Sequence, residues 1–208
     1  APHVLPTIDT EMAAFVNEEL IKHKIDVITN VAAVKFHNDT ILLETDETLQ
    51  SDLTILSVGV QPETTLAKNT GISLGLRDAI LVDENYETSI KDIYAVGDAI
   101  VVKNQLGKDA LISLASPANR QGRQVADVIN GLPVKNKGAI GTAIVRVFEL
   151  QIASTGLSEH QLNLLGLKHK IVHITSNNHA GYYPGATSIT LKLIFNPETG
   201  EILGAQAV

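Results

Sequence analysis

No cysteine occurs anywhere in the 208 residues. The chain therefore has no disulfide, no thiolate ligand for a metal ion and no sulfur nucleophile. Any thiol chemistry in which this sequence takes part must come from a cysteine elsewhere, and the sequence predicts no metal site.

A concentration of positive charge is also missing. The formal net charge is -7, and acidic and basic residues are scattered along the chain. A surface that binds nucleic acid needs clustered Lys and Arg to neutralise phosphates. We therefore expect no nucleic-acid partner.

Long apolar runs are absent as well, although 44% of the residues are hydrophobic, enough for a packed core. No run approaches the ~18 apolar residues that indicate a membrane span. The first residues, Ala1 to Val4, lack the charged start and apolar middle of a signal peptide. We expect no membrane partner and a cytoplasmic location. The abrupt start and a final strand pattern that still runs at Val208 predict a chain truncated at both ends.

The first part of the chain predicts one helix followed by short strands. Apolar residues at helical spacing favour a helix over residues 10–23, capped by Asp9 or Thr10. The β-rich runs lie at 26–29, 31–36, 40–44 and 52–58. Residues 53–58 are almost continuously apolar, which is typical of a strand covered on both faces in a parallel sheet.

The rest of the chain predicts a change of architecture near residue 137. Before it we expect helices at 64–69 and 117–129 and strands at 80–82 and 93–96. After it we expect strands at 143–148, 170–175, 188–195 and from 202 onward, and a helix at 158–165 that a Ser-x-x-Gln capping pattern opens. Strands with a helix after an α/β half predict a separate α+β module.

The most informative segment runs from Thr88 to Ala99, with the sequence TSIKDIYAVGDA. A strand that ends in Gly-Asp allows a ligand close to the glycine backbone, and a carboxylate there can accept hydrogen bonds from sugar-like hydroxyls. On pattern alone, an ordinary strand and tight turn is equally acceptable. The segment resembles the second FAD motif of flavoproteins with two dinucleotide-binding domains. In that family the aspartate holds a ribityl hydroxyl of the flavin; Asp98 matches it, and Gly97 precedes it.

The second segment, Leu114 to Arg123, predicts a helix whose first turn begins at Pro117 and whose cap is Ser116. Such an amino end is an anion site. The alternative is an ordinary capped surface helix. In the family that the chain resembles, this helix points at the pyrimidine edge of the flavin, so the resemblance implies that Ala115 and Ser116 face that edge.

The third segment is a Gly-x-x-Pro turn, Gly59 to Pro62, after the apolar run. Taken singly it marks only a turn. It resembles the place where the nucleotide domain returns toward the flavin domain, and the resemblance implies that Gly59 leaves room beside the nicotinamide. The family's Gly-x-Gly-x-x-Gly loop does not occur in this sequence.

The fourth segment is His179 to Ala186, HAGYYPGA. Paired tyrosines before Pro-Gly are more often loop packing. The string resembles coenzyme A-disulfide and persulfide reductases, in which a tyrosine of the dimerisation domain serves the partner subunit's cysteine site. The resemblance implies that Tyr182 or Tyr183 has this catalytic role. We interpret His179 as a polar loop residue.

Together these segments resemble the FAD-dependent pyridine nucleotide-disulfide oxidoreductases, in the coenzyme A-disulfide reductase or NADH oxidase branch. The resemblance implies an α/β fold with parts of two three-layer ββα dinucleotide-binding domains, NAD(P) at 1–62 and FAD at 63–137. An incomplete α+β dimerisation domain follows at 138–208.

The activity that the resemblance implies belongs to a homodimer that passes electrons from NAD(P)H through FAD to a small disulfide or persulfide such as coenzyme A disulfide. Two alternatives stay open: an NADH oxidase or peroxidase of the same family, or a non-catalytic dimerisation or binding fragment. We expect the reactive cysteine and both nucleotide loops upstream of Ala1, and the chain alone to be inactive.

Overall fold

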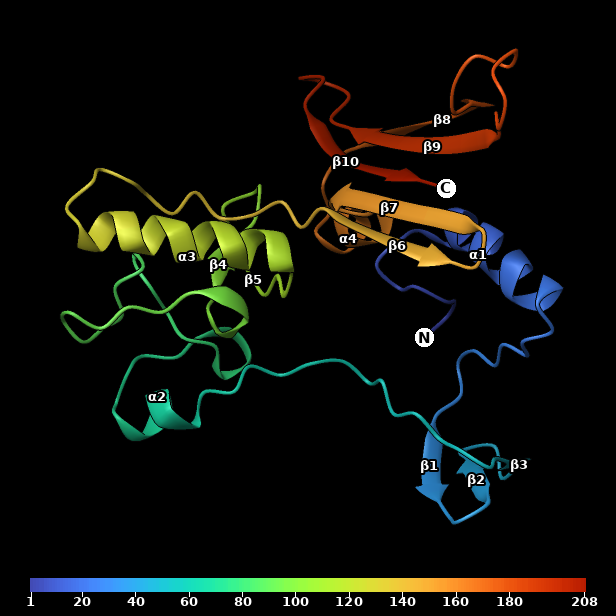
Figure 1. The fold of residues 1–208 in the computed structure, drawn as a ribbon, viewed down its shortest axis with the longest axis horizontal. Coiled ribbons are helices and arrows are strands. Elements are labelled where there is room, and N and C mark those ends of the chain that lie inside the picture. Colours follow the sequence, from blue (N-terminus) through green and yellow to red (C-terminus); the bar gives the residue numbers. More distant parts are fainter. The chain divides into compact units, whose positions relative to one another are not determined.

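The structure, a computed structural model, describes all 208 residues and contains two compact units (Figure 1). The first unit combines residues 1–57 with residues 142–208, and the second unit consists of residues 58–141. The three-part division at residues 62 and 137 stays a prediction.

An antiparallel five-stranded sheet is the framework of the first unit (Figure 1). Its strands are β6 (Ala143–Val147), β7 (Leu150–Gly156), β8 (Lys170–Asn177), β9 (Ser188–Phe195) and β10 (Ile202–Ala207). The spatial order is β6-β7-β10-β9-β8, so the last strand is inserted between two earlier ones. The predicted α+β character of this module is confirmed, but β7 was not predicted. Its centre contains Ala153 and Ser154, small residues that carry no strong strand signal.

Two helices pack on one face of this sheet. Helix α1 (Thr10–Lys22) buries Met12, Ala13 and Val16 against Ile8 and Ile152. Helix α4 (Glu159–Leu164) buries Leu162 with Ile194 and Leu203. The predicted capping box is confirmed, because the Ser158 hydroxyl accepts from the Gln161 amide and the Gln161 side chain accepts from the Ser158 amide.

The first unit also holds a small meander of three strands, β1 (Ala33–Phe36), β2 (Thr40–Leu43) and β3 (Thr48–Gln50). The predicted strand at 26–29 is wrong, and so is the one at 52–58. Residues 52–58 form no ladder, and the side chains of Leu53, Ile55 and Val58 are 81, 82 and 92% exposed. A strand needs a neighbour to satisfy its backbone groups, and none of the 208 residues pairs with this segment.

The second unit contains helices α2 (Thr65–Asn69) and α3 (Ala115–Ile129), two short 3-10 turns and a two-stranded ladder. The turns are η1 (Leu76–Asp78) and η2 (Gly97–Ala99), and the ladder joins β4 (Val102–Lys103) to β5 (Asp109–Ala110). Tyr86, Ile100 and Val102 form its buried core.

The predicted strands at 80–82 and 93–96 are wrong as strands. Both segments make only isolated bridges: Ile80 bridges Leu74 and Ile100, and Tyr94 bridges Glu87. Each partner is met at a single position, and a ladder needs successive pairs. The apolar residues of both segments nevertheless pack against the core of the second unit.

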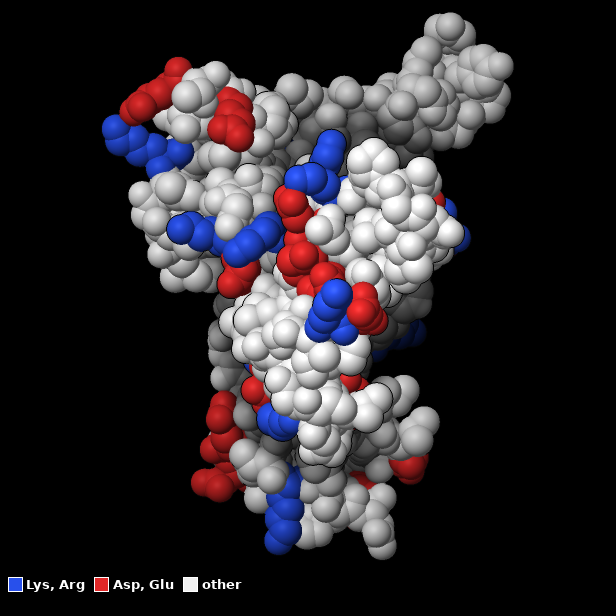
Figure 2. All heavy atoms as spheres, turned by 90° about the vertical axis from the view of Figure 1, so that its left-hand side faces the viewer, with Lys and Arg blue, Asp and Glu red and all other residues white.

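Helix length and surface charge bear on membrane and polyanion binding. No helix is both long and apolar enough to cross a bilayer. On the face drawn in Figure 2, Lys and Arg are interspersed with Asp and Glu. This distribution offers no continuous positive surface on that face for a polyanion.

Candidate functional site

The Gly97–Asp98 turn lies between two extended residues, Val96 and Ile100. Val96 is extended at φ -147°, ψ 169°, and Gly97 then takes φ 82°, a left-handed conformation that favours glycine. Asp98 stands on the turn with an exposed side chain, and no hydrogen bond or ion pair within the chain engages its carboxylate. The carboxylate is therefore free to accept hydrogen bonds from a ligand.

Helix α3 begins two residues earlier than expected. Leu114 is the N-cap residue, with no side-chain hydrogen bond to the helix, and Ala115 and Ser116 are the first two helical residues. The prediction that Ser116 caps the helix is therefore wrong. Pro117 is tolerated at the third position because an amide in the first turn has no partner in its own helix. Without a side-chain cap, the first-turn amides of Ala115 and Ser116 remain available as donors.

The structure brings this turn and this helix together. A Cβ built on Gly97 would lie 3.9 Å from the Cβ of Ala118, and the Gly97 amide donates to the Gln121 side chain at 2.6 Å. A free carboxylate acceptor and uncapped amide donors thus lie on two touching elements. The arrangement suits a ligand with a hydroxyl-bearing chain and an electron-rich edge, and the sugar chain and pyrimidine edge of a flavin have these two features.

Gly59 lies in the same unit at φ 100°, and no atom comes within 4 Å of the Cβ that another residue would carry there. The position is therefore open and conformationally reserved for glycine.

Tyr182 and Tyr183 occupy the loop between β8 and β9 in the first unit. Their side chains are 88 and 64% exposed, and their rings contact each other edge to face at a centroid distance of 6.2 Å. The Tyr183 ring also meets the His179 ring at 6.2 Å. Neither phenol oxygen makes a hydrogen bond within the chain, so both can bond to another molecule.

A buried lysine in the first unit is an unpredicted feature. The side chain of Lys192, on β9, is fully buried, and its ammonium group meets three carboxylates. It lies 2.9 Å from Asp9 and 2.7 Å from Glu159, and it also bonds to Glu11. Carboxylate oxygens of the three acids lie within 4.8 Å of one another. The lysine supplies the positive charge that such a cluster requires.

Asp9 connects this cluster to the start of a second helix. Its carboxylate accepts hydrogen bonds from the amides of Glu159 at 3.0 Å and His160 at 3.1 Å, and from the Gln206 side chain at 2.7 Å. The Asp9 amide in turn donates to Gln206 at 2.9 Å. Asp9 is the N-cap residue of α1, as one of the two alternatives predicted, but its side chain caps α4 instead.

The pKa values of the cluster reflect this pairing. Burial raises the pKa of Asp9, but hydrogen bonds from the His160 amide, Lys192 and the Glu159 amide outweigh burial and hold it below its ordinary value. Burial likewise raises the pKa of Glu11, but the hydrogen bond from Lys192 outweighs burial and holds this pKa below its ordinary value. Burial lowers the pKa of Lys192, but its three carboxylate partners raise it above its ordinary value. The folded state therefore favours the charged forms.

A first prediction concerns the pH dependence of stability. The contribution of Asp9 to stability is present above its ordinary pKa of 3.8 and is lost as the pH falls through the lower pKa of the folded state. The contribution of Glu11 is present above its ordinary pKa of 4.5 and is lost in the same way. The contribution of Lys192 is present below 10.5 and is lost as the pH rises through its higher folded value. We expect the urea concentration at the unfolding midpoint to decrease at pH values below 3.8 and at pH values above 10.5. A midpoint that is unchanged across both limits would contradict the pairing.

Two histidines also face this cluster. His173 lies 3.3 Å from Glu11 and His169 lies 3.7 Å from Glu159, and each forms an ion pair only when protonated. Substituting both histidines by Gln removes any contribution of histidine charge to the loss of stability at low pH. The loss below pH 3.8 should remain in that double variant, because it comes from the carboxylates.

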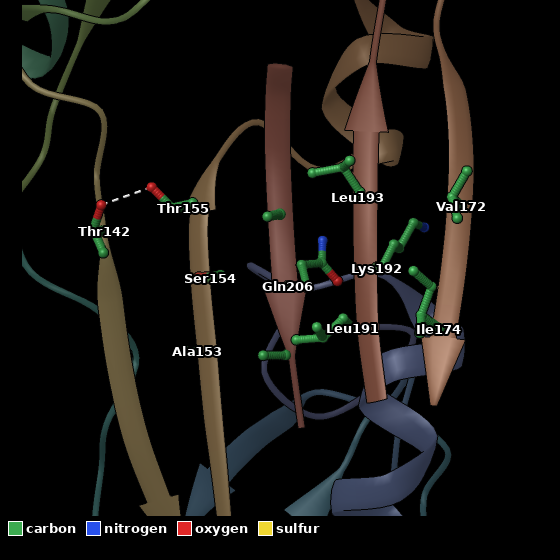
Figure 3. Close-up of a pocket in the computed structure, with 12 residues that line it drawn as sticks. Thr142, Ala153, Ser154, Thr155, Val172, Ile174, Leu191, Lys192, Leu193 and Gln206 are labelled. Carbon is green, nitrogen blue, oxygen red and sulfur yellow. Dashed lines mark hydrogen bonds between the residues drawn. The ribbon is translucent and has the colours of Figure 1, made fainter. Parts of the chain in front are cut away.

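The opposite face of the sheet carries a hollow of about 350 Å³. Leu191 and Leu193 lie there beside Val172 and Ile174, and the Thr142 and Thr155 hydroxyls bond to each other at 2.7 Å at its edge (Figure 3). Lys192 borders the hollow by its backbone, since its side chain points into the buried cluster. The hollow is largely apolar, and the paired hydroxyls of Thr142 and Thr155 mark its polar edge.

Comparison with known proteins identifies the family. Residues 1–122 match the pyridine nucleotide-disulphide oxidoreductase family, and residues 142–208 match the dimerisation domain of the same family. The chain belongs to this family. The fold class predicted from the Gly97–Asp98 motif and the carboxyl-terminal module is thereby confirmed.

Individual members of the pyridine nucleotide-disulphide oxidoreductase family cover nearly the whole chain. Over 97% of its own length, the chain is 32% identical to the NAD(P)H sulfur oxidoreductase (CoA-dependent) of Pyrococcus furiosus. Over 100% of its own length, it is 34% identical to an NADH oxidase of Methanocaldococcus jannaschii. The crystal structure of reduced Bacillus anthracis CoADR-RHD matches 100% of the chain with a TM-score of 0.97 and 44% identity, and the match covers 38% of that chain. The chain spans about half the length of the two curated relatives, 46 and 47% respectively.

Two groups in this family member escaped the sequence analysis. Lys192 stands between Leu191 and Leu193 in the apolar part of β9, and a charge at a buried strand position signals a buried partner. Gln121 lies one helical turn after Pro117 on the buried stripe of α3, and both are buried there. In both cases the sequence shows that a polar side chain is enclosed, but not what it contacts.

Proposed function

We propose that this chain is part of an FAD-dependent oxidoreductase that takes electrons from NAD(P)H and reduces a small disulfide or persulfide, such as coenzyme A disulfide. The observation that carries the proposal is the contact of the Gly97–Asp98 turn with α3, the helix whose start has no side-chain cap. Family membership and the CoA-dependent sulfur oxidoreductase among the relatives support it.

Each residue of the proposed flavin site has one task. Asp98 accepts a hydrogen bond from a hydroxyl of the flavin sugar chain, since its carboxylate is exposed and unpaired. The amides of Ala115 and Ser116 face the pyrimidine edge, where the helix dipole stabilises negative charge. Gly59 leaves space for the nicotinamide. When bound, the flavin supplies the chemistry that converts hydride transfer from NAD(P)H into electron transfer to sulfur.

The sulfur step needs a cysteine that these 208 residues do not contain. We propose that it lies in the same full-length protein, that this protein is a homodimer, and that Tyr182 or Tyr183 reaches the cysteine site of the partner subunit. The match to the family's dimerisation domain and the exposure of both unpaired phenols support this assignment. We propose that the 208 residues alone are inactive.

The NADH oxidase in the comparison supports a second candidate, an oxidase or peroxidase in which the cysteine passes through a sulfenic acid. The reducible substrate distinguishes the two. A full-length protein that consumes NAD(P)H with oxygen and ignores coenzyme A disulfide is the oxidase, whereas anaerobic NAD(P)H oxidation that requires the disulfide supports the reductase.

A second prediction tests the flavin site itself. In the full-length protein, Asp98→Ala removes a hydrogen-bond acceptor and should weaken FAD binding by about 1–3 kcal/mol. Flavin absorbance per polypeptide after desalting, followed by titration of the apoprotein with FAD, measures the change. Asp109→Ala is the matched control, because it removes an equal charge in the same unit from an exposed ion pair with Lys103. Equal flavin content in the wild type and the Asp98 variant would remove Asp98 from the site.

A further inference from the structure

The orientation of Asp98 depends on the turn that carries it. Its exposed side chain has no partner in the chain, so the position of its carboxylate is set by the backbone of η2. That backbone begins at Gly97 in a left-handed conformation, and glycine is the most flexible residue. A contact that fixes Gly97 therefore also fixes where the Asp98 carboxylate points.

Gln121 supplies that contact. Its side chain is buried, at 5% exposure, and its Oε1 accepts a hydrogen bond from the Gly97 amide at 2.6 Å. This is the hydrogen bond that joins η2 to α3. Its donor is partly buried, and losing its acceptor leaves an amide that water reaches poorly.

The same helix carries the second half of the proposed site. Gln121 is one and a half turns from Ala115 and Ser116, whose amides are uncapped, and the intervening turn of α3 is regular. A rigid helix segment thus links the Gly97 amide to the helix start. The acceptor on Asp98 and the donors at the start of α3 keep a fixed separation only while this link is intact.

We propose that Gln121 is a positioning residue for the flavin: by holding the Gly97 amide, it sets the Asp98 carboxylate and the amides of Ala115 and Ser116 at the spacing that one flavin spans. The inference rests on the proposed function and extends it to a residue that does not itself touch the cofactor.

Gln124 provides a matched control in the same helix. Its Oε1 also accepts a 2.6 Å hydrogen bond, from the hydroxyl of Tyr86, whose side chain belongs to the core of the second unit. Gln124→Met therefore disturbs α3 and its packing to a similar degree, but leaves the Gly97 amide paired. An effect confined to Gln121 must arise from the turn.

The conservative variant Gln121→Glu keeps the acceptor. The Gln121 amide nitrogen makes no hydrogen bond and is not among the buried unpaired atoms, so it keeps solvent contact. A carboxylate oxygen at that place can remain hydrated while the other oxygen accepts from Gly97. Gln121→Met has a similar volume and no acceptor.

The experiment compares FAD dissociation constants of the full-length apoprotein and these three variants by flavin fluorescence titration. We expect Gln121→Met to weaken binding about 10-fold through the unpaired amide. Gln121→Glu and Gln124→Met should stay within about 3-fold of the wild type. Wild-type affinity in Gln121→Met, equal weakening in Gln124→Met, or equal weakening in Gln121→Glu would each overturn the inference.

Amide hydrogen exchange keeps the inference testable if Gln121→Met does not fold. In the wild-type protein the Gly97 amide should exchange slowly before FAD is added, and about 10-fold more slowly once FAD is bound. Rapid exchange of Gly97 in the apoprotein overturns the inference. A full-length wild-type protein that binds no FAD overturns the proposed function and this inference with it, whereas flavin binding that is indifferent to Gln121 overturns the inference alone.

Discussion

Replacing Lys192 by Met should lower the free energy of unfolding by about 3–5 kcal/mol, because it leaves three carboxylates together without their cation. The Lys192 side chain is fully buried and is the common partner of Asp9, Glu11 and Glu159. Methionine fills most of the volume, so a cavity accounts for little of the loss. Urea denaturation at neutral pH, followed by circular dichroism, measures the effect.

Lys168→Met is the control for the loss of a lysine as such. Lys168 pairs with Glu198 at 2.9 Å, but the two side chains are 79 and 67% exposed. Solvent screens such a pair, so its loss should cost about 0–1 kcal/mol. Similar destabilisation in the two variants would show that the buried cluster contributes no more to the free energy of unfolding than an exposed ion pair.

Lys192→Met should also reverse the dependence of stability on pH in the acid range. In the wild type, protonation of Asp9 and Glu11 removes bonds to Lys192, and stability falls as the pH falls. In Lys192→Met the acids repel one another and bind protons more readily when folded than when unfolded. Stability should then rise as the pH falls from neutral toward the carboxylate range. Parallel pH profiles for the two proteins would contradict the electrostatic explanation.

The sequence predicted best the elements whose signals are local. Residues 188–195 form β9 as predicted, because alternating β-branched and apolar residues need only a sheet to join. The capping box at Ser158 is likewise local, since its two partners are three residues apart. Residues 53–58 have an equally strong apolar pattern, but a strand requires a neighbour that the pattern does not provide.

The residues of the candidate sites could be predicted where a sequence motif contains them, but contacts between residues far apart in the sequence could not. Gly97, Asp98 and the start of α3 were predicted to belong together because of a family resemblance, and the structure brings Gly97 against α3. The partners of Lys192 lie 33 to 183 residues away in sequence, so no local pattern could reveal them. The helix start was misplaced at Pro117, with Ser116 as its cap, because a Ser-Pro pair is a common cap signal.

The tyrosine prediction concerns the second half-reaction. In the full-length dimer, Tyr→Phe at position 182 or 183 should slow disulfide reduction by ~10- to 1000-fold while flavin reduction by NAD(P)H keeps its rate. The reason is that a phenol can donate a hydrogen bond to the leaving thiolate, and phenylalanine preserves the ring without the donor. Neither phenol bonds within the chain, and both side chains are exposed, so folding should be little affected.

Stopped-flow absorbance separates the two half-reactions: anaerobic mixing with NAD(P)H reports flavin reduction, and mixing the reduced enzyme with coenzyme A disulfide reports reoxidation. Tyr94→Phe is the matched control, since it deletes a phenol oxygen in the second unit that has no hydrogen bond in the chain, and it should leave disulfide reduction unchanged. Because Tyr182 and Tyr183 touch edge to face, the single variants must be made separately and combined, and the effect of the double variant should equal that of the essential position. Full disulfide reductase activity in both single variants and in the double variant would show that the pair serves loop packing or dimer contact, and the thiolate would then need another donor.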